Sequence, residues 1–191
     1  MPLALAPEPD VDASADEALV AAYRRGDERA FEVLFARYRD RVTGYAWRML
    51  GRREEAEEVC VEAFCRVVEG RWSPTGRFRA FLFTVVHRRC LDRIRRRGRK
   101  QRALQLLGFG RTADPTPQDA LELGERNAQL EAALRELPEE HRATVMLFYG
   151  QELGSKEVAA VLGCTDQQVR SRLSYARRKL RKALESQEAS P

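Results

Sequence analysis

The sequence lacks the long apolar runs that a membrane protein needs. No stretch approaches the ~18–20 consecutive apolar residues of a membrane span. The opening residues, MPLALAPEPD, have neither the basic start nor the long apolar centre of a secretory signal. We therefore predict a cytoplasmic protein with no membrane insertion.

Residues that bind metals or perform catalysis are also scarce. The chain has only two His residues, and its four Cys residues show no C-x-x-C spacing. We interpret these cysteines as small core or turn residues in a reducing compartment. An alternative is that His87 and Cys90, which fall on one helical face, ligate a metal or sense redox state. The chain also lacks a Gly-rich phosphate loop and paired carboxylates in a plausible pocket. We therefore predict no metal site, no cofactor, no catalytic residue and no enzymatic activity.

Long stretches of the chain lack charge of one sign, because acidic and basic residues are sorted into blocks. The overall net charge of +5 hides this sorting. Residues 1–16 carry a net −4 and residues 114–140 a net −6, whereas residues 77–102 carry +10 and residues 165–182 carry +6. Two basic blocks separated by an acidic one predict two contacts with a polyanion, made by separate modules.

No stretch alternates apolar and polar residues with the period of a β-strand, so the predicted fold class is all-α. Breakers and helical periodicity predict two small helical modules joined by a flexible linker, the second module ending in a helix-turn-helix. The predicted parts are a disordered acidic N-terminus at 1–15, a first module at 16–98, a linker at 99–116 and a second module at 117–187. Within the first module we expect helices from Asp16 to Gly26, from Asp27 to Gly51, over about 53–69, and from Phe78 to about Arg97.

The run GSKEVAAVLGCTDQQVRSRLSYARRKLRKAL at 154–184 carries the clearest functional signal. Ser155 opens a short apolar-periodic segment, Gly163 closes it, and Thr165 starts a longer helix. Two helices joined by such a tight turn form a helix-turn-helix, whose second helix normally enters the major groove of DNA. The alternative is an Arg-rich solvated helix of an unrelated bundle. The residues on the second helix with side chains suited to bases and phosphates are Gln167, Gln168, Arg170, Ser171, Arg172, Tyr175, Arg177, Arg178 and Lys179.

A second signal is the combination of aromatic and basic residues around 70–97. Single-stranded DNA is held by cations that neutralise phosphates and by side chains against which bases stack. The aromatic candidates are Trp72, Phe78, Phe81 and Phe83. For Phe81 we favour a core position, whereas Trp72 lies in a polar loop and is the ring we would test first.

Three runs, in this order, resemble the extracytoplasmic-function (ECF) sigma factors. The run REEAEEVCVEAFCRVVEG at 53–70 resembles their acidic helix, and FRAFLFTVVHRRCLDRIRRR at 78–97 resembles their promoter-melting helix. Residues 134–184 are similar to their promoter-binding module. The resemblance extends from Asp16 to Leu184 except for the linker. It implies a protein that binds bacterial core RNA polymerase, at the clamp of the largest subunit and the flap of the second largest, and directs it to promoters. Family members are commonly held by an anti-sigma factor, which we expect as a further partner.

The resemblance also assigns residues to surfaces. The polymerase-binding residues it implies are Glu57, Glu58, Val59, Glu62 and Phe64. The residues it implies for the minus-ten element are Trp72, Arg77, Phe78, Arg88, Arg89, Arg93, Arg95 and Arg96. Those for the minus-thirty-five element are Gln167, Gln168, Arg170, Ser171, Arg172, Tyr175, Arg177 and Arg178.

The chain departs from the family pattern at several of these positions. Val61 stands where the family often has Gln, Arg88 where it has Asn, and Phe81 where it has Trp. Two alternatives to a sigma factor remain at this stage. A stand-alone helix-turn-helix regulator would leave the Glu-rich helix and the aromatic–basic helix without a role. A nucleic-acid enzyme would need catalytic groups that the sequence does not offer.

Overall fold

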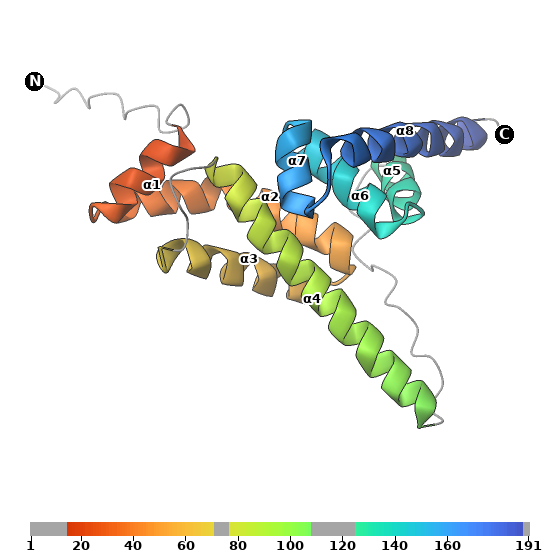
Figure 1. Ribbon diagram of the computed structural model, residues 1–191, viewed down its shortest axis with the longest axis horizontal. Coiled ribbons are helices and arrows are strands. Elements are labelled where there is room, and N and C mark those ends of the chain that lie inside the picture. The colour runs from red at the N-terminus through yellow and green to blue at the C-terminus, as the bar shows by residue number, and fades with distance from the viewer. Residues whose placement is uncertain (1–14, 71–76, 108–124, 189–191) are drawn as a thin grey trace, which may run out of the picture.

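The computed structural model describes residues 15–70, 77–107 and 125–188, and all regular structure within them is helical (Figure 1). The first module contains α1 (Asp16–Arg24), α2 (Glu28–Leu50), α3 (Arg53–Val68) and α4 (Phe78–Leu106). The second contains α5 (Glu125–Arg135), α6 (Glu139–Val145), a π-helical turn (Met146–Gly150), α7 (Ser155–Leu162) and α8 (Asp166–Glu188). The all-α prediction is confirmed. None of the described helices is both long and apolar enough to cross a membrane.

Several helices begin or end at the residues that the local signals predicted. The Asp27 side chain accepts a hydrogen bond from the backbone N–H of Arg29 (3.1 Å), which caps α2. Gly51, with φ of 71°, ends α2 in the left-handed conformation. At the start of α8, the Thr165 hydroxyl accepts from the Gln168 N–H (3.2 Å), while the Gln168 side chain accepts from the Thr165 N–H (2.9 Å). This reciprocal pair is a capping box, which fixes the turn of the helix-turn-helix.

Helix α4 is longer than predicted. We expected it to end near Arg97 and a linker to begin at residue 99, but the helix continues to Leu106. Gly98 costs a helix only about 1 kcal/mol relative to Ala, and it is followed by RKQRALQL, which is rich in strong helix formers. One glycine without a proline was therefore too weak a signal to end the helix. The rest of the predicted linker, from residue 108, lies outside the described residues.

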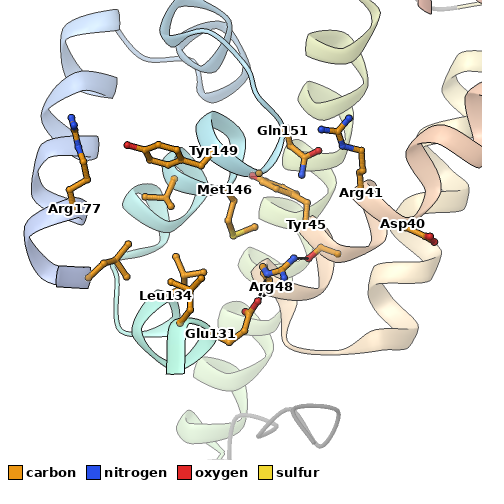
Figure 2. A pocket seen from close by; sticks show the side chains of 15 residues that line it. Asp40, Arg41, Tyr45, Arg48, Glu131, Leu134, Met146, Tyr149, Gln151 and Arg177 are labelled. Atoms are coloured by element: carbon orange, nitrogen blue, oxygen red, sulfur yellow. Dashed lines mark hydrogen bonds and ion pairs between the residues drawn. The ribbon is translucent and has the colours of Figure 1, made fainter. Parts of the chain in front are cut away.

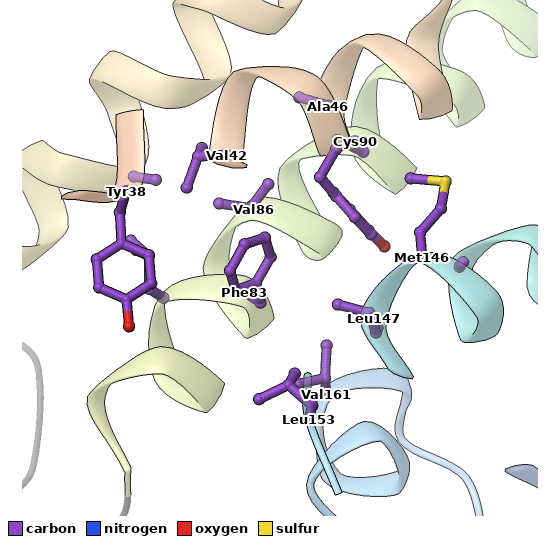
Figure 3. Packing of buried hydrophobic residues seen from close by; sticks show 14 of the residues in the cluster. Tyr38, Val42, Ala46, Phe83, Val86, Cys90, Met146, Leu147, Leu153 and Val161 are labelled. Carbon is purple, nitrogen blue, oxygen red and sulfur yellow. The ribbon is translucent and has the colours of Figure 1, made fainter. Parts of the chain in front are cut away.

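The two modules share one hydrophobic core. The sequence predicted only that a flexible linker joins them, and did not predict that they pack together. Figure 3 shows Phe83 and Val86 of α4 facing Leu147 and Val161 of the second module. All four side chains are at most 3% exposed. Helix α4, which carries the basic block of the first module, packs along α7. The second module therefore covers one side of this helix. Apolar burial of this kind favours a packed pair of modules over two independent ones.

Polar contacts join the modules at the edges of that core. The Arg79 guanidinium donates to the carbonyl oxygen of Gln151 (2.9 Å). Arg77 lies 3.4 Å from the carboxylate of Glu157 on α7. On the opposite side, Arg48 of α2 pairs with Glu131 of α5 at 2.6 Å, and the Glu131 side chain is only 8% exposed. Ion pairs therefore link the second module to the start of α4 and to the C-terminal half of α2.

Candidate functional site

The outward side of α8 carries most of the residues that were predicted to bind the minus-thirty-five element. Val169, Leu173 and Ala176 on its inward side are at most 4% exposed, so the polar residues between them point away from the module. The exposed members of the predicted set, which we call the α8 basic face, are Gln167, Gln168, Arg170, Ser171, Arg177 and Arg178. Its three arginines give this face an excess of positive charge, as DNA phosphates require, although Arg177 also lines a cavity between α2 and the second module.

Two members of that set are instead held within the second module. The Arg172 side chain is only 16% exposed and pairs with the carboxylate of Glu140. The half-buried Tyr175 ring lies 4.6 Å from the His141 ring, measured between centroids. Both contacts hold α8 against the segment that starts α6. Replacing either residue would therefore disturb the module as well as any contact with DNA.

The arginines of α4 divide into an exposed group and a paired group. Arg88, Arg95 and Arg96 are exposed, and together with the exposed Arg77 they form what we call the α4 basic face. Arg89 and Arg93 lie against α3 instead. Arg88, Arg95 and Arg96 are open to a polyanion, whereas Arg77 pairs with Glu157 of the second module. Arg89 and Arg93 are engaged by acidic residues of the first module.

Arg93 is the centre of an ion-pair cluster between α3 and α4. Its guanidinium lies 2.9 Å from Glu62 and 3.1 Å from Glu58, and its side chain is 17% exposed. Arg89 lies 3.2 Å from the same Glu62. The hydrogen bond from Arg93 holds the pKa of Glu62 below its usual value. Residues implied for DNA and residues implied for polymerase therefore pair with one another in this structure.

The predicted aromatic contacts differ in their placement. Phe78 is 0% exposed, and its ring lies 5.7 Å from the Tyr38 ring in an edge-to-face arrangement. The predicted DNA contact of Phe78 therefore does not fit this structure, because the first residue of α4 turns inward to close the core. Phe81 packs partly buried against the core, as we favoured, and Phe83 is fully buried. Trp72 lies outside the described residues.

Helix α3 presents an acidic groove, formed by Glu54, Glu57, Glu58, Val61 and Glu62. Three of these were in the predicted polymerase-binding set. The other two members of that set, Val59 and Phe64, are 0% and 3% exposed and belong to the protein's own core. Val61, noted above as standing where the family often has Gln, was not in that set, but it is 59% exposed and lines the groove. Its position between glutamates on the outward side of the helix was the available signal.

His87 and Cys90 are buried in the core and do not form a metal site. Their exposed fractions are 6% and 0%. The His87 Nδ1 and the Tyr45 hydroxyl share a hydrogen bond at 2.8 Å, and burial lowers the pKa of His87 to about 4. Burial also raises the pKa of the Cys90 thiol to about 12, which makes it unreactive. Among the described residues, no three His, Cys, Asp or Glu side chains are grouped so that they could hold a metal ion.

A cavity of about 650 Å³ lies between α2 and the second module (Figure 2). Its walls are largely apolar, and the labelled Leu134 and Met146 come from the second module, whereas Tyr45 comes from α2. The Arg48–Glu131 pair closes one side. Nothing in this lining resembles a set of catalytic groups. The surfaces suited to function are therefore the two basic faces and the acidic groove.

Two family models match the chain, one in each module. The model described as "Sigma-70 region 2" matches residues 34–100, and the model described as "Sigma-70, region 4" matches residues 127–180. The first match contains α3 and most of α4, and the second contains the helix-turn-helix. Each basic face therefore falls largely within its own matched region.

Curated relatives extend the likeness over most of the chain. ECF RNA polymerase sigma factor SigE of Mycolicibacterium smegmatis is 34% identical over 163 residues, which cover 82% of this chain and 63% of the relative. ECF RNA polymerase sigma factor SigM of Mycobacterium tuberculosis is 30% identical over 183 residues, which cover 88% of this chain and 84% of the relative. RNA polymerase sigma-H factor of Pseudomonas aeruginosa is 28% identical, covering 89% of this chain and 94% of the relative.

Solved structures support the fold. CnrH, solved in complex with the cytosolic domain of CnrY, aligns with a TM-score of 0.67 and 22% identity, over 91% of this chain and 99% of that chain. The sigma factor RpoE of Bartonella quintana, solved with the anti-sigma factor NepR, aligns with a TM-score of 0.66 and 20% identity, over 81% and 96%. At these identities the likeness concerns the fold of the two modules.

Proposed function

Because the chain belongs to the ECF RNA polymerase sigma factors, alternative sigma factors that direct promoter-specific transcription initiation, we propose how its surfaces divide that work. The acidic groove of α3 meets the clamp of the polymerase's largest subunit. The α4 basic face meets the minus-ten element, and the α8 basic face reads the minus-thirty-five element. The second module also meets the flap of the second largest subunit. The observation that carries this proposal is the presence of two basic faces on separate modules.

The domain limits follow the same division. We assign residues 16–98 to the polymerase-binding and minus-ten module, with α4 running beyond it, and residues 117–187 to the minus-thirty-five module. The chain acts by positioning the polymerase's active site and has no catalysis of its own. It works in the cytoplasm, where polymerase and promoter DNA are found.

An anti-sigma factor is the further partner we propose. RpoE of Bartonella quintana was solved with its anti-sigma factor NepR, and CnrH with the cytosolic domain of CnrY. Both align with this chain over four fifths of its length or more. A partner of this class would compete with polymerase or DNA for the acidic groove or the basic faces.

The packed modules must separate for both promoter elements to be read at once. The minus-ten and minus-thirty-five elements are separated by about 25 base pairs, which at ~3.4 Å each is roughly 85 Å. In the packed arrangement, Arg77 of the α4 basic face is paired with Glu157 of α7. We propose that this arrangement belongs to the free chain and that polymerase binding draws the modules apart.

One experiment tests both the polymerase contact and the separation. A spin label on Cys65, which is exposed on α3, and a second at Ser174→Cys on α8 report the distance between modules in a Cys164→Ser background. Adding purified core polymerase should retain the chain on size-exclusion chromatography and lengthen the distance between the labels. A retained chain with an unchanged distance contradicts the separation. A chain that core polymerase does not retain contradicts the proposed role of the groove.

A further inference from the structure

A second cavity between the modules is lined by arginines from four different helices. It has a volume of about 300 Å³ and adjoins the cavity of Figure 2 at the Arg48–Glu131 pair. The other three arginines are Arg97 on α4, Arg135 at the end of α5 and Arg142 on α6. Four guanidinium groups brought together from both modules give this cavity an unusual concentration of positive charge.

The acids around the cavity neutralise only part of this charge. Glu131, the single acid among the described lining residues, is paired with Arg48 at 2.6 Å. Arg97 pairs with Glu55 outside the cavity and donates through Nη1 to the Leu50 carbonyl oxygen (2.7 Å). Arg135 and Arg142 have no comparable ion pair in the described part of the chain. The cavity is therefore positively charged, and the guanidinium groups of Arg135 and Arg142 remain to bind an anion.

Arg142 has the strongest requirement for such an anion. Its Nε–H is buried and has no hydrogen-bond partner within the described chain, and the same holds for the Nε–H of Arg97. Native proteins pair nearly all buried donors, so an unpaired one points to a missing acceptor. Burial also lowers the pKa of Arg142, an effect that Glu139 opposes and Arg135 reinforces. The surroundings therefore disfavour the charge of Arg142 unless a further negative charge is present.

We propose that this cavity binds a small phosphate-bearing ligand whose oxygens accept hydrogen bonds from Arg135 and Arg142. The planar guanidinium fork matches two phosphate oxygens at once, which makes arginine pairs well suited to this group. The volume lies at the lower end of the range for small-molecule sites and accommodates a pyrophosphate-sized group. Arg48 and Arg97 of the same cavity belong to the first module, so a ligand held by Arg135 and Arg142 lies between the two modules. This inference does not depend on which promoters the chain reads.

The test is calorimetric titration of the full chain with inorganic pyrophosphate at constant ionic strength. We expect saturable binding that Arg135→Gln/Arg142→Gln weakens by at least about tenfold, because each charged hydrogen bond lost is expected to weaken binding about ten- to a hundredfold. The matched control is Arg99→Gln/Arg102→Gln, which removes two charges from the exposed far part of α4 and should leave the affinity unchanged within about twofold. Equal weakening in both double variants would show charge screening alone and overturn the site.

Two further measurements keep the test decisive. If Arg142→Gln unfolds the chain, Arg135→Gln alone, at an exposed position, must still weaken pyrophosphate binding. Trp47 lines the cavity and is the only tryptophan left in a Trp72→Phe background, so its fluorescence should change on saturation. The absence of saturable binding, or no effect of Arg135→Gln, overturns the proposal. A short DNA duplex that displaces pyrophosphate through the same arginines would assign the phosphate to nucleic acid and overturn the small ligand.

Discussion

His87 is a buried titratable group whose state depends on the intact core. It shares a hydrogen bond with the Tyr45 hydroxyl, and both residues lie where α2 and α4 meet. Burial lowers the pKa of His87 to about 4, from a usual value near 6.5, so the folded protein holds this imidazole neutral. Between these two values the unfolded chain binds a proton that the folded chain does not. Stability is therefore expected to fall as the pH decreases through this window.

This pH dependence is the first prediction. Between pH 7 and pH 4, the group removes up to about 3 kcal/mol from the free energy of unfolding, at ~1.36 kcal/mol per pKa unit. Urea titrations across this range measure the loss, and His87→Gln, which can still accept from Tyr45, should flatten the curve. His141, the other histidine, is the comparison: burial and the nearby Arg172 also lower its pKa, but it is less buried than His87, so His141→Gln should flatten the curve less. A His87→Gln variant with the same pH slope as the wild type would contradict a neutral buried imidazole.

Phe78 gives the second prediction at the residue scale. Because its ring is 0% exposed, Phe78→Ala should lower the free energy of unfolding by about 3–5 kcal/mol, through lost burial and the cavity left behind. Denaturant unfolding measures this loss, and Phe78→Leu should recover part of it. An alanine variant of unchanged stability that nevertheless fails to open promoters would restore the role in DNA binding that the resemblance implied.

At the scale of elements, α3 and α4 show what periodicity can and cannot predict. Both helices, and the inward position of Phe81, followed from apolar spacing and breakers. The pairing of Arg93 with Glu58 and Glu62 did not, because sequence alone does not say which sides of two helices meet. For the same reason, Val59 and Phe64 were assigned to a partner's surface although they face their own core. The resemblance to the family located the acidic helix, whereas the packing of the helices decides which of its residues are exposed to a partner protein.

The third prediction concerns the acidic groove. Glu58→Arg should weaken binding to core polymerase by at least about tenfold, because it reverses a charge at the proposed interface and faces Arg93 with a like charge. Fluorescence anisotropy of a labelled chain with core polymerase measures the affinity. Glu32→Arg, the same reversal at an exposed position of α2, is the matched control. Unaltered affinity in Glu58→Arg, with a folded protein, would remove the groove from the interface.

The fourth prediction separates two arginines of α8. Arg170 is 71% exposed and has only an exposed i,i+4 pair with Asp166, so Arg170→Ala should cost little stability. If Arg170 reads a base, the variant loses about 1–3 kcal/mol of discrimination at the minus-thirty-five element. Arg172→Ala should lower thermal stability as well, because it breaks the contact with Glu140. Thermal unfolding measures the stability of both variants, and promoter-selection assays with the holoenzyme measure their selectivity, with Arg181→Ala as the control. An Arg170→Ala variant that lost stability but kept its selectivity would contradict this division.

At the scale of the whole molecule, the sequence predicted the two modules and missed how they pack. Charge blocks and breakers are local features, and they were sufficient to separate the modules and to place a helix-turn-helix in the second. The contacts that join the modules, such as Arg48 with Glu131, link residues 83 positions apart. Contacts between residues this far apart in the sequence form only when the whole chain folds. Local sequence signals therefore could not predict the shared core or the cavities beside it.

The central claim is that this chain gives core polymerase its promoter specificity through both modules. The most direct measurement is in vitro transcription with purified bacterial core polymerase on a genomic promoter pool, with and without the chain. We predict start sites that appear only with the chain, preceded by two shared elements about 25 base pairs apart. The absence of new transcripts, together with tight specific DNA binding by the chain alone, would contradict the account and identify a stand-alone regulator.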